Sequence, residues 1–121
     1  MFRRLAIAAA LLACAATARP AAAQEAYCGG ALVAQRFITQ VAPGPAGRAT
    51  YSVELRNTGP EAREFRLVVT GSMMGRPASG MVQSIAGGAT ATFPLGFSPN
   101  MAGAAPLRGD QLAIATRIGC L

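Results

Sequence analysis

The stretch ATYSVELR, residues 49–56, constrains the fold of this chain more than any other feature, because apolar and polar residues alternate along all of it. Ala49, Tyr51, Val53 and Leu55 share one side, and the residues between them are polar or charged. Successive side chains of a strand point to opposite faces of its sheet. The pattern therefore predicts an antiparallel strand with one buried face and one solvated face.

Five further segments carry a similar signal and are separated by turns rich in glycine and proline. The expected strands are 32–41, 64–70, 81–85, 89–97 and 111–120. Four of them have residues expected to face inward: Val33, Phe37 and Val41 in 32–41; Phe65, Leu67 and Val69 in 64–70; Ala91, Phe93, Leu95 and Phe97 in 89–97; and Leu112, Ile114 and Ile118 in 111–120. Pro94 has no amide hydrogen for a ladder, so its strand is expected at a sheet edge or bulged there. No segment after residue 23 keeps a helical period long enough for a stable helix. We predict an all-β fold, an antiparallel β-sandwich of six or seven strands.

The first 23 residues have the order of features of a secretory signal peptide. Arg3 and Arg4 give a positive start, residues 5–18 are apolar, and AAA at 21–23 offers the small residues that a signal peptidase accepts. The apolar run is shorter than the roughly 20 residues that a permanent membrane-spanning helix needs. We expect cleavage before Gln24. Residues 24–121 would then form one exported domain, periplasmic or secreted, in a bacterium.

Two cysteines, Cys28 and Cys120, lie near the two ends of the expected domain. An even number of cysteines in an exported domain favours a disulfide, and the CxxC spacing of redox enzymes does not occur. A Cys28–Cys120 bridge would close a loop of about 91 residues. On the chain-entropy model, such a bridge adds roughly 4–5 kcal/mol to stability.

The third cysteine, Cys14, is expected to leave with the signal peptide. An alternative stays open, because LLAC, residues 11–14, resembles the bacterial lipoprotein box. In that case Cys14 would be lipidated, and the protein would be a lipid-anchored accessory protein of the envelope.

The segments YSVELRNTG, FRLVVTG and IAGGATATFPLGF resemble the bacterial extracellular immunoglobulin-like domains, over residues 31–121. The resemblance implies an immunoglobulin-like β-sandwich. This chain departs from antibody-type domains in three ways. It has no tryptophan, it has Ile118 where a tyrosine would precede the second cysteine, and its two cysteines are too far apart for the inter-sheet bridge. A Cys28–Cys120 bond would instead join the terminal segments.

The composition gives little support to catalysis or to nucleic-acid binding. Without histidine, no Ser-His or Cys-His pair can form. The acidic residues are Glu25, Glu54, Glu61, Glu64 and Asp110, and we interpret them as solvated surface groups. Residues 24–121 carry eight arginines against these five acids, a net charge of +3 that is too small and scattered for a nucleic-acid surface. We predict a protein that is not an enzyme and needs no cofactor.

Four methionines, Met73, Met74, Met81 and Met101, lie in or beside two irregular segments, 71–80 and 98–109. Thioethers suit copper(I), so a methionine-based copper protein of the periplasm is one alternative. Methionine also packs cores and covers adaptable binding surfaces. For the methionine side chains we favour packing in the core or the loops over a partner surface. The two irregular segments, with Arg76, are nevertheless the candidate place where another envelope or secreted protein binds, through an exposed strand edge. The tripeptide RGD, residues 108–110, is interpreted as a turn into the last strand.

Overall fold

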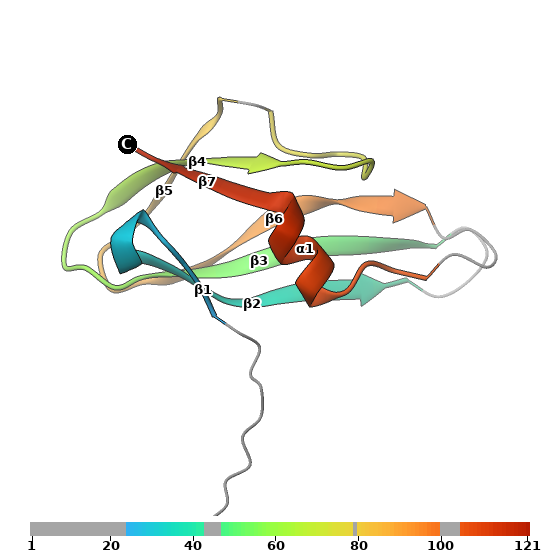
Figure 1. Cartoon of the computed structure of the whole chain (residues 1–121), viewed down its shortest axis with the longest axis horizontal. Helices are drawn as coiled ribbons and strands as arrows, with labels where there is room; N and C mark the ends of the chain where they lie inside the picture. The colour runs from blue at the N-terminus through green and yellow to red at the C-terminus, as the bar shows by residue number, and fades with distance from the viewer. Residues whose placement is uncertain (1–23, 43–46, 79, 100–104) are drawn as a thin grey trace, which may run out of the picture.

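The computed structural model describes residues 24–42, 47–78, 80–99 and 105–121 (Figure 1). Its elements are β1 (Glu25–Tyr27), the 3₁₀ turn η1 (Cys28–Gly30), β2 (Leu32–Val41), β3 (Arg48–Asn57), β4 (Arg63–Val69), β5 (Val82–Ile85), β6 (Thr90–Pro99), α1 (Gly109–Ala115) and β7 (Thr116–Cys120). The predicted signal peptide, Cys14 and Met101 lie outside the described residues.

The strands form two antiparallel sheets, one in the order β1-β2-β3-β6 and the other in the order β5-β4-β7 (Figure 1). The predicted all-β fold is confirmed in this coarse sense. The sequence pattern did not predict β1, which is a three-residue strand paired with the start of β2.

One apolar core lies between the sheets, and the residues predicted to face inward on β3 and β4 all belong to it. Tyr51, Val53 and Leu55 of β3 are fully buried. Phe65 of β4 packs its ring nearly perpendicular to that of Phe93 on β6, with 5.3 Å between the ring centroids. This edge-to-face contact, a favourable geometry for aromatic pairs, joins one sheet to the other.

A β-bulge in β2 corrects the predicted pattern of that strand. The pairing with β3 shifts register between Ala34 and Arg36, so one extra residue, Gln35, reverses the alternation. Leu32 and Ala34 therefore face the core before the bulge, and the prediction that Val33 does so is wrong. After the bulge the predicted parity holds, because Phe37 packs against the core and Val41 lies opposite the buried Ala49.

A second register shift lies in β6, where the sequence predicted one. The pairing with β3 passes from Pro94 to Gly96, which leaves Leu95 as the extra residue, and β6 is an edge strand. The prediction for Pro94 is confirmed. The same shift makes the prediction for Phe97 wrong, because Phe97 lies opposite Thr50 on the outer face rather than in the core. There the guanidinium of Arg48 sits 4.2 Å from the centre of its ring.

The short helix α1 replaces the first half of the strand predicted over 111–120, so the prediction of no helix is wrong here. Leu112 is fully buried, whereas Ile114 is 80% exposed. In a strand these two residues would have shared a face. The helix contacts both β2 and β7 and spans the open side between the sheets (Figure 1).

The predicted disulfide is confirmed. Cys28 and Cys120 are bonded, and their Cα atoms are 5.7 Å apart. Cys28 has a φ of 57°, a left-handed conformation that is uncommon outside glycine. The bridge joins the turn after β1 to the end of β7 and so ties one sheet to the other.

Candidate functional site

The candidate site is an open stretch of backbone along the edge of β2. The short strand β1 pairs only with Leu32–Ala34. Within the described residues, no other strand pairs with the outer side of β2 beyond the bulge. Residues 36–41 therefore form a strand edge with a partner on one side only.

The direction of the free backbone groups follows from the ladder with β3. In an antiparallel pair, alternate residues direct both their N–H and their C=O toward the neighbouring strand. The N–H of Ala42 donates to the carbonyl of Arg48, the residue that precedes Ala49 on β3. By alternation, Ile38 and Gln40 also face β3. Phe37, Thr39 and Val41 direct their N–H and C=O groups outward.

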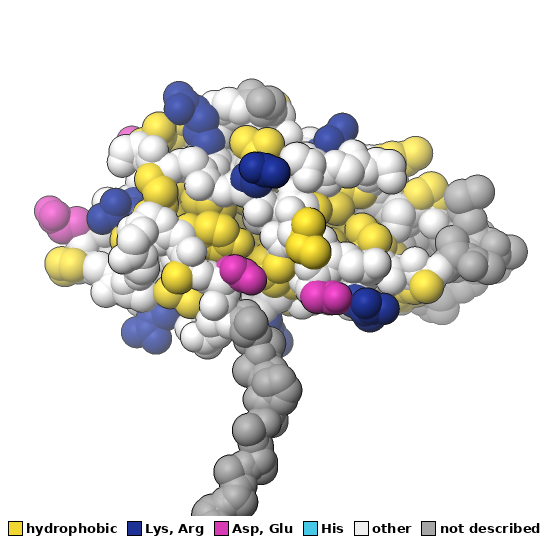
Figure 2. All heavy atoms as spheres, viewed as in Figure 1, with side chains coloured by type: hydrophobic (Ala, Val, Ile, Leu, Met, Phe, Trp, Pro, Cys, Tyr) yellow, Lys and Arg dark blue, Asp and Glu magenta, His cyan; other side chains and the backbone are white. Residues whose placement is uncertain are grey.

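A groove lies beside this edge, between β2 and α1. It has a volume of about 590 Å³ and is lined by Glu25, Arg36, Phe37, Gly109, Asp110, Ala113 and Ile114. Figure 2 looks onto the side of the molecule that carries α1 and shows apolar side chains exposed beside acidic ones near its middle. Ile114 is the most exposed large apolar residue in the described part, and Val41, farther along the edge, is 52% exposed. The groove therefore offers apolar contacts beside unpaired main-chain groups.

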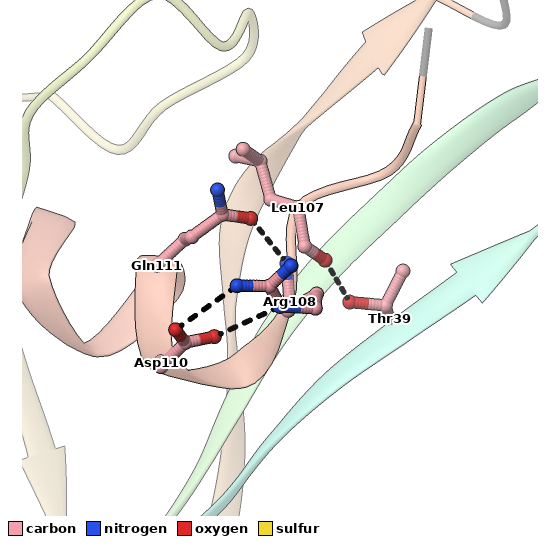
Figure 3. Close-up of polar contacts among 5 residues, drawn as sticks. All are labelled: Thr39, Leu107, Arg108, Asp110 and Gln111. Carbon is pink, nitrogen blue, oxygen red and sulfur yellow. Dashed lines mark hydrogen bonds and ion pairs between the residues drawn. The ribbon is translucent and has the colours of Figure 1, made fainter.

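Hydrogen bonds fix the segment before α1 to β2 and β3, and Figure 3 shows the bond to β2. The Thr39 hydroxyl donates to the carbonyl of Leu107 over 3.0 Å. The N–H of Leu107 donates to the Tyr51 hydroxyl over 3.1 Å. The N–H of Arg108 donates to Oε1 of Gln111 over 2.8 Å, which satisfies one free donor at the start of the helix. The wall of the groove is thus held in place relative to the strand edge.

The RGD tripeptide leads into α1 and not into a strand, so the predicted turn into the last strand is wrong. Nε of Arg108 lies 3.3 Å from a carboxylate oxygen of Asp110, and both side chains are exposed (Figure 3). The hydrogen bond from Arg108 lowers the pKa of Asp110 below its ordinary value. The two charged side chains are turned toward each other, across the first turn of the helix.

Charges near the groove are largely matched. Arg36 forms an ion pair with Glu54 on the outer face of the four-stranded sheet, with 3.3 Å between Nε and Oε1. Glu25 lies on β1 at the end of the groove. Burial raises the pKa of the neighbouring Tyr27, and the charge of Glu25 raises it further. The stretch 37–41 itself carries no charge.

Three of the candidate partner-binding residues, Met73, Met74 and Arg76, line one open pocket beside the end of β4. Met73 is 5% exposed and packs in the core, which is the packing role favoured for the methionines. Met74 and Met81 are about half exposed. Arg76 donates to the carbonyl of Val69 over 3.1 Å, which anchors the loop to the end of β4.

The loop after β4 instead covers part of the β6 edge. Met74 and Phe97 exchange two main-chain hydrogen bonds of 2.8 Å. Phe97 directs its main-chain groups away from β3 and toward Met74, so the loop covers the edge at this point. The part of the edge that the loop leaves open begins at Pro94, on the other side of the Leu95 bulge. The carbonyl of Ala89 accepts from Asn57, so Ala91 and Phe93 face β3 and Pro94 faces outward, where it has no N–H to offer. The β6 edge is therefore guarded, in contrast to that of β2.

No protein family model, curated protein or solved structure matches this chain. In the described ranges, no helix is long and apolar enough to cross a membrane. Those ranges also contain no group of three or more histidine, cysteine, aspartate or glutamate side chains placed to hold a metal ion.

The sequence pointed to a strand edge but not to the residues that form it. The missed residues are Thr39, Ile114 and the backbone groups beside them. Ile114 was expected to be in the core, on a strand. The signal that could have revealed the site is the spacing of Leu32, Ala34 and Phe37, which breaks the period of two and implies a bulge.

Proposed function

We propose that residues 24–121 form a non-enzymatic protein-binding module of the bacterial envelope with an immunoglobulin-like β-sandwich fold. A partner would add an extended segment to the edge of β2 through main-chain hydrogen bonds and place a side chain in the adjoining groove. The observation that carries the proposal is the uncharged stretch 37–41, with outward main-chain groups at alternate residues beside an apolar groove. Such an edge is a template for strand pairing.

The strand neighbours support the immunoglobulin-like part of the proposal. In immunoglobulin domains, strand B pairs with E in one sheet and C with F in the other. Here β3 pairs with β6 and β4 pairs with β7, so the chain crosses between sheets in the same order. The likeness rests on these two pairs: in a constant-type domain F lies between C and G, whereas here β4, the counterpart of C, lies between β5 and β7.

Two further observations support an exported, non-catalytic role. The Cys28–Cys120 disulfide is typical of a protein that works in an oxidising compartment, which agrees with the signal-like residues 1–23. The acidic side chains Glu54 and Asp110 form ion pairs with arginines, and the chain has no histidine to act as a general base.

The test is site-specific photo-cross-linking in cells that produce the full chain. A photoreactive amino acid replaces Ile114 in the groove or, as the matched control, Val82 on β5, which is 44% exposed. We expect a covalent adduct with a bound protein from position 114 and none from position 82.

Two variants of Thr39 then test whether the adduct at position 114 depends on main-chain pairing at the β2 edge. Thr39→Pro removes an outward N–H without removing a bond to β3, so the adduct should disappear. Thr39→Ala loses only the hydroxyl bond to Leu107 and should keep the adduct. Equal adducts from both probe positions, or an adduct that survives the proline, would contradict the proposal.

A further inference from the structure

The open edge of β2 is complementary to itself. We infer that a second copy of this chain docks on it, with the two β2 strands antiparallel about a two-fold axis at Thr39. This inference rests on the proposed function, since it names an occupant of the same strand-accepting edge. The reasons are the order of residues along the edge, the exposed apolar side chains beside it and the absence of charge from residues 37–41.

The residues of the edge pair favourably when the strand meets its own copy in this register. Thr39 lies opposite the second copy's Thr39, and Phe37 lies opposite the second copy's Val41. Threonine pairs and pairs of an aromatic with a β-branched residue are among the favourable cross-strand neighbours. All three residues direct their main-chain groups outward, so each copy would satisfy the free N–H and C=O groups of the other.

The exposed apolar side chains also find cover in this arrangement. Residues directly opposite each other in a sheet point to the same face. The second copy's Val41 therefore lies on the face of Phe37, where the groove beside α1 is lined by Phe37, Ala113 and Ile114. Because a two-fold interface is isologous, Val41 of the first copy enters the second copy's groove in return. The pairing would bury two side chains, Val41 and Ile114, that a single copy leaves 52% and 80% exposed.

Charge does not oppose this contact. Residues 37–41 are uncharged, and the next residue, Arg36, would face the second copy's Ala42 rather than another cation. Its charge is matched within its own chain by Glu54. Natural edges avoid self-pairing through charged residues, proline or short length. The outermost strands of the two sheets have such guards: Pro94 on β6, Arg117 on the five-residue β7, and a length of only three residues in β1 and four in β5.

The first experiment measures mass against concentration for purified residues 24–121 with the disulfide intact, by light scattering and sedimentation equilibrium. We expect a reversible monomer–dimer equilibrium. Val41→Glu places an anion beside Phe37 and near the second copy's Glu25 and Asp110, and should raise the dimer dissociation constant by at least about tenfold. The same substitution at the comparably exposed Val82 should leave the constant unchanged.

The second experiment reads the register. In a mixture of isotope-labelled and unlabelled protein, intermolecular nuclear Overhauser effects should join the Val41 methyl groups to the Phe37 ring. A wild-type protein that stays monomeric at millimolar concentration would overturn the inference, as would intermolecular contacts that map to β5 or β6. Either result leaves the proposed function to be decided by the adducts at Ile114, whose mass separates a second copy from another protein.

Discussion

Asn57, at the end of β3, is a fully buried polar residue whose side-chain amide has partners for both of its polar atoms. Nδ2 donates to the carbonyls of Glu61 and Ile85 over 2.8 and 3.1 Å, and Oδ1 accepts from the N–H of Gly59 over 3.0 Å. The side chain thus joins the end of β3, the following turn and β5. The sequence predicted a turn after the strand at 49–56 but not the burial of Asn57, because Ile85 is distant in sequence and only the packing of the two sheets brings it near.

Replacing Asn57 should therefore cost more stability than an exposed hydrogen bond does. Asn57→Ala removes these bonds and leaves buried main-chain groups without partners, so we expect a loss of about 2–4 kcal/mol in the free energy of unfolding. Thr58→Ala removes an exposed hydroxyl that donates to the carbonyl of Gly30, and should cost about 1 kcal/mol or less. Urea denaturation of both variants measures the difference. Equal losses would show that the Asn57 network does not stabilise the fold.

The ion pair at the start of α1 should be visible in the titration of one carboxyl group. The hydrogen bond from Arg108 lowers the pKa of Asp110 from its ordinary value of 3.8. A lowered folded-state pKa means that the contribution of the pair to stability is present above the unfolded-state pKa and is lost as the pH falls through the folded-state pKa. Carboxyl NMR of Arg108→Gln should show the pKa of Asp110 rising toward 3.8. An unchanged pKa would mean that the pair does not form in solution.

At the scale of secondary-structure elements, alternation predicted the strands well where pairing is regular and failed where one residue is inserted. Strands β3 and β4 follow the period of two throughout. The bulges at Gln35 and Leu95 reverse the parity within a strand, which a fixed period cannot represent. Residues 111–115 were expected to form a strand because large apolar residues alternate there, but they belong to the helix α1, in which Leu112 packs in the core.

A pair of alanine substitutions distinguishes the helix from the strand that the sequence predicted. In α1, Leu112 is fully buried and Ile114 is mostly exposed. We expect Leu112→Ala to lower the free energy of unfolding by about 2–5 kcal/mol. Ile114→Ala should change it by less than about 0.5 kcal/mol. Thermal or urea unfolding measures both changes. Comparable losses would favour the predicted strand, in which the two side chains share a face, over the helix.

At the scale of the whole molecule, the sequence predicted the class of fold and the covalent link between the two ends of the domain, but not which strand edge stays open. An edge is defined by the spatial order of strands, and β1, which covers part of β2, has only three residues and no pattern of its own. The predicted loops were distinguished by composition alone. Packing then placed Met73 in the core and paired Met74 with β6.

The disulfide should contribute a large share of the stability of the domain. Cys28→Ser with Cys120→Ser frees a loop whose ends are 92 positions apart, so we expect a loss of roughly 4–5 kcal/mol on the chain-entropy model. The left-handed backbone at Cys28 could relax in this variant and would return part of that loss. Denaturant unfolding of the oxidised protein and the double variant measures the change. A difference below about 1 kcal/mol would contradict a stabilising role for the bridge.

Residue-resolved amide hydrogen exchange of the dilute, oxidised domain shows whether the edge of β2 is open. We expect protection to alternate along this strand. The amides of Ile38 and Gln40 should be protected by β3, and those of Phe37, Thr39 and Val41 should exchange as solvent-exposed groups. Uniform protection of all five amides in the monomer would mean that the edge is covered and that no partner strand can pair with it.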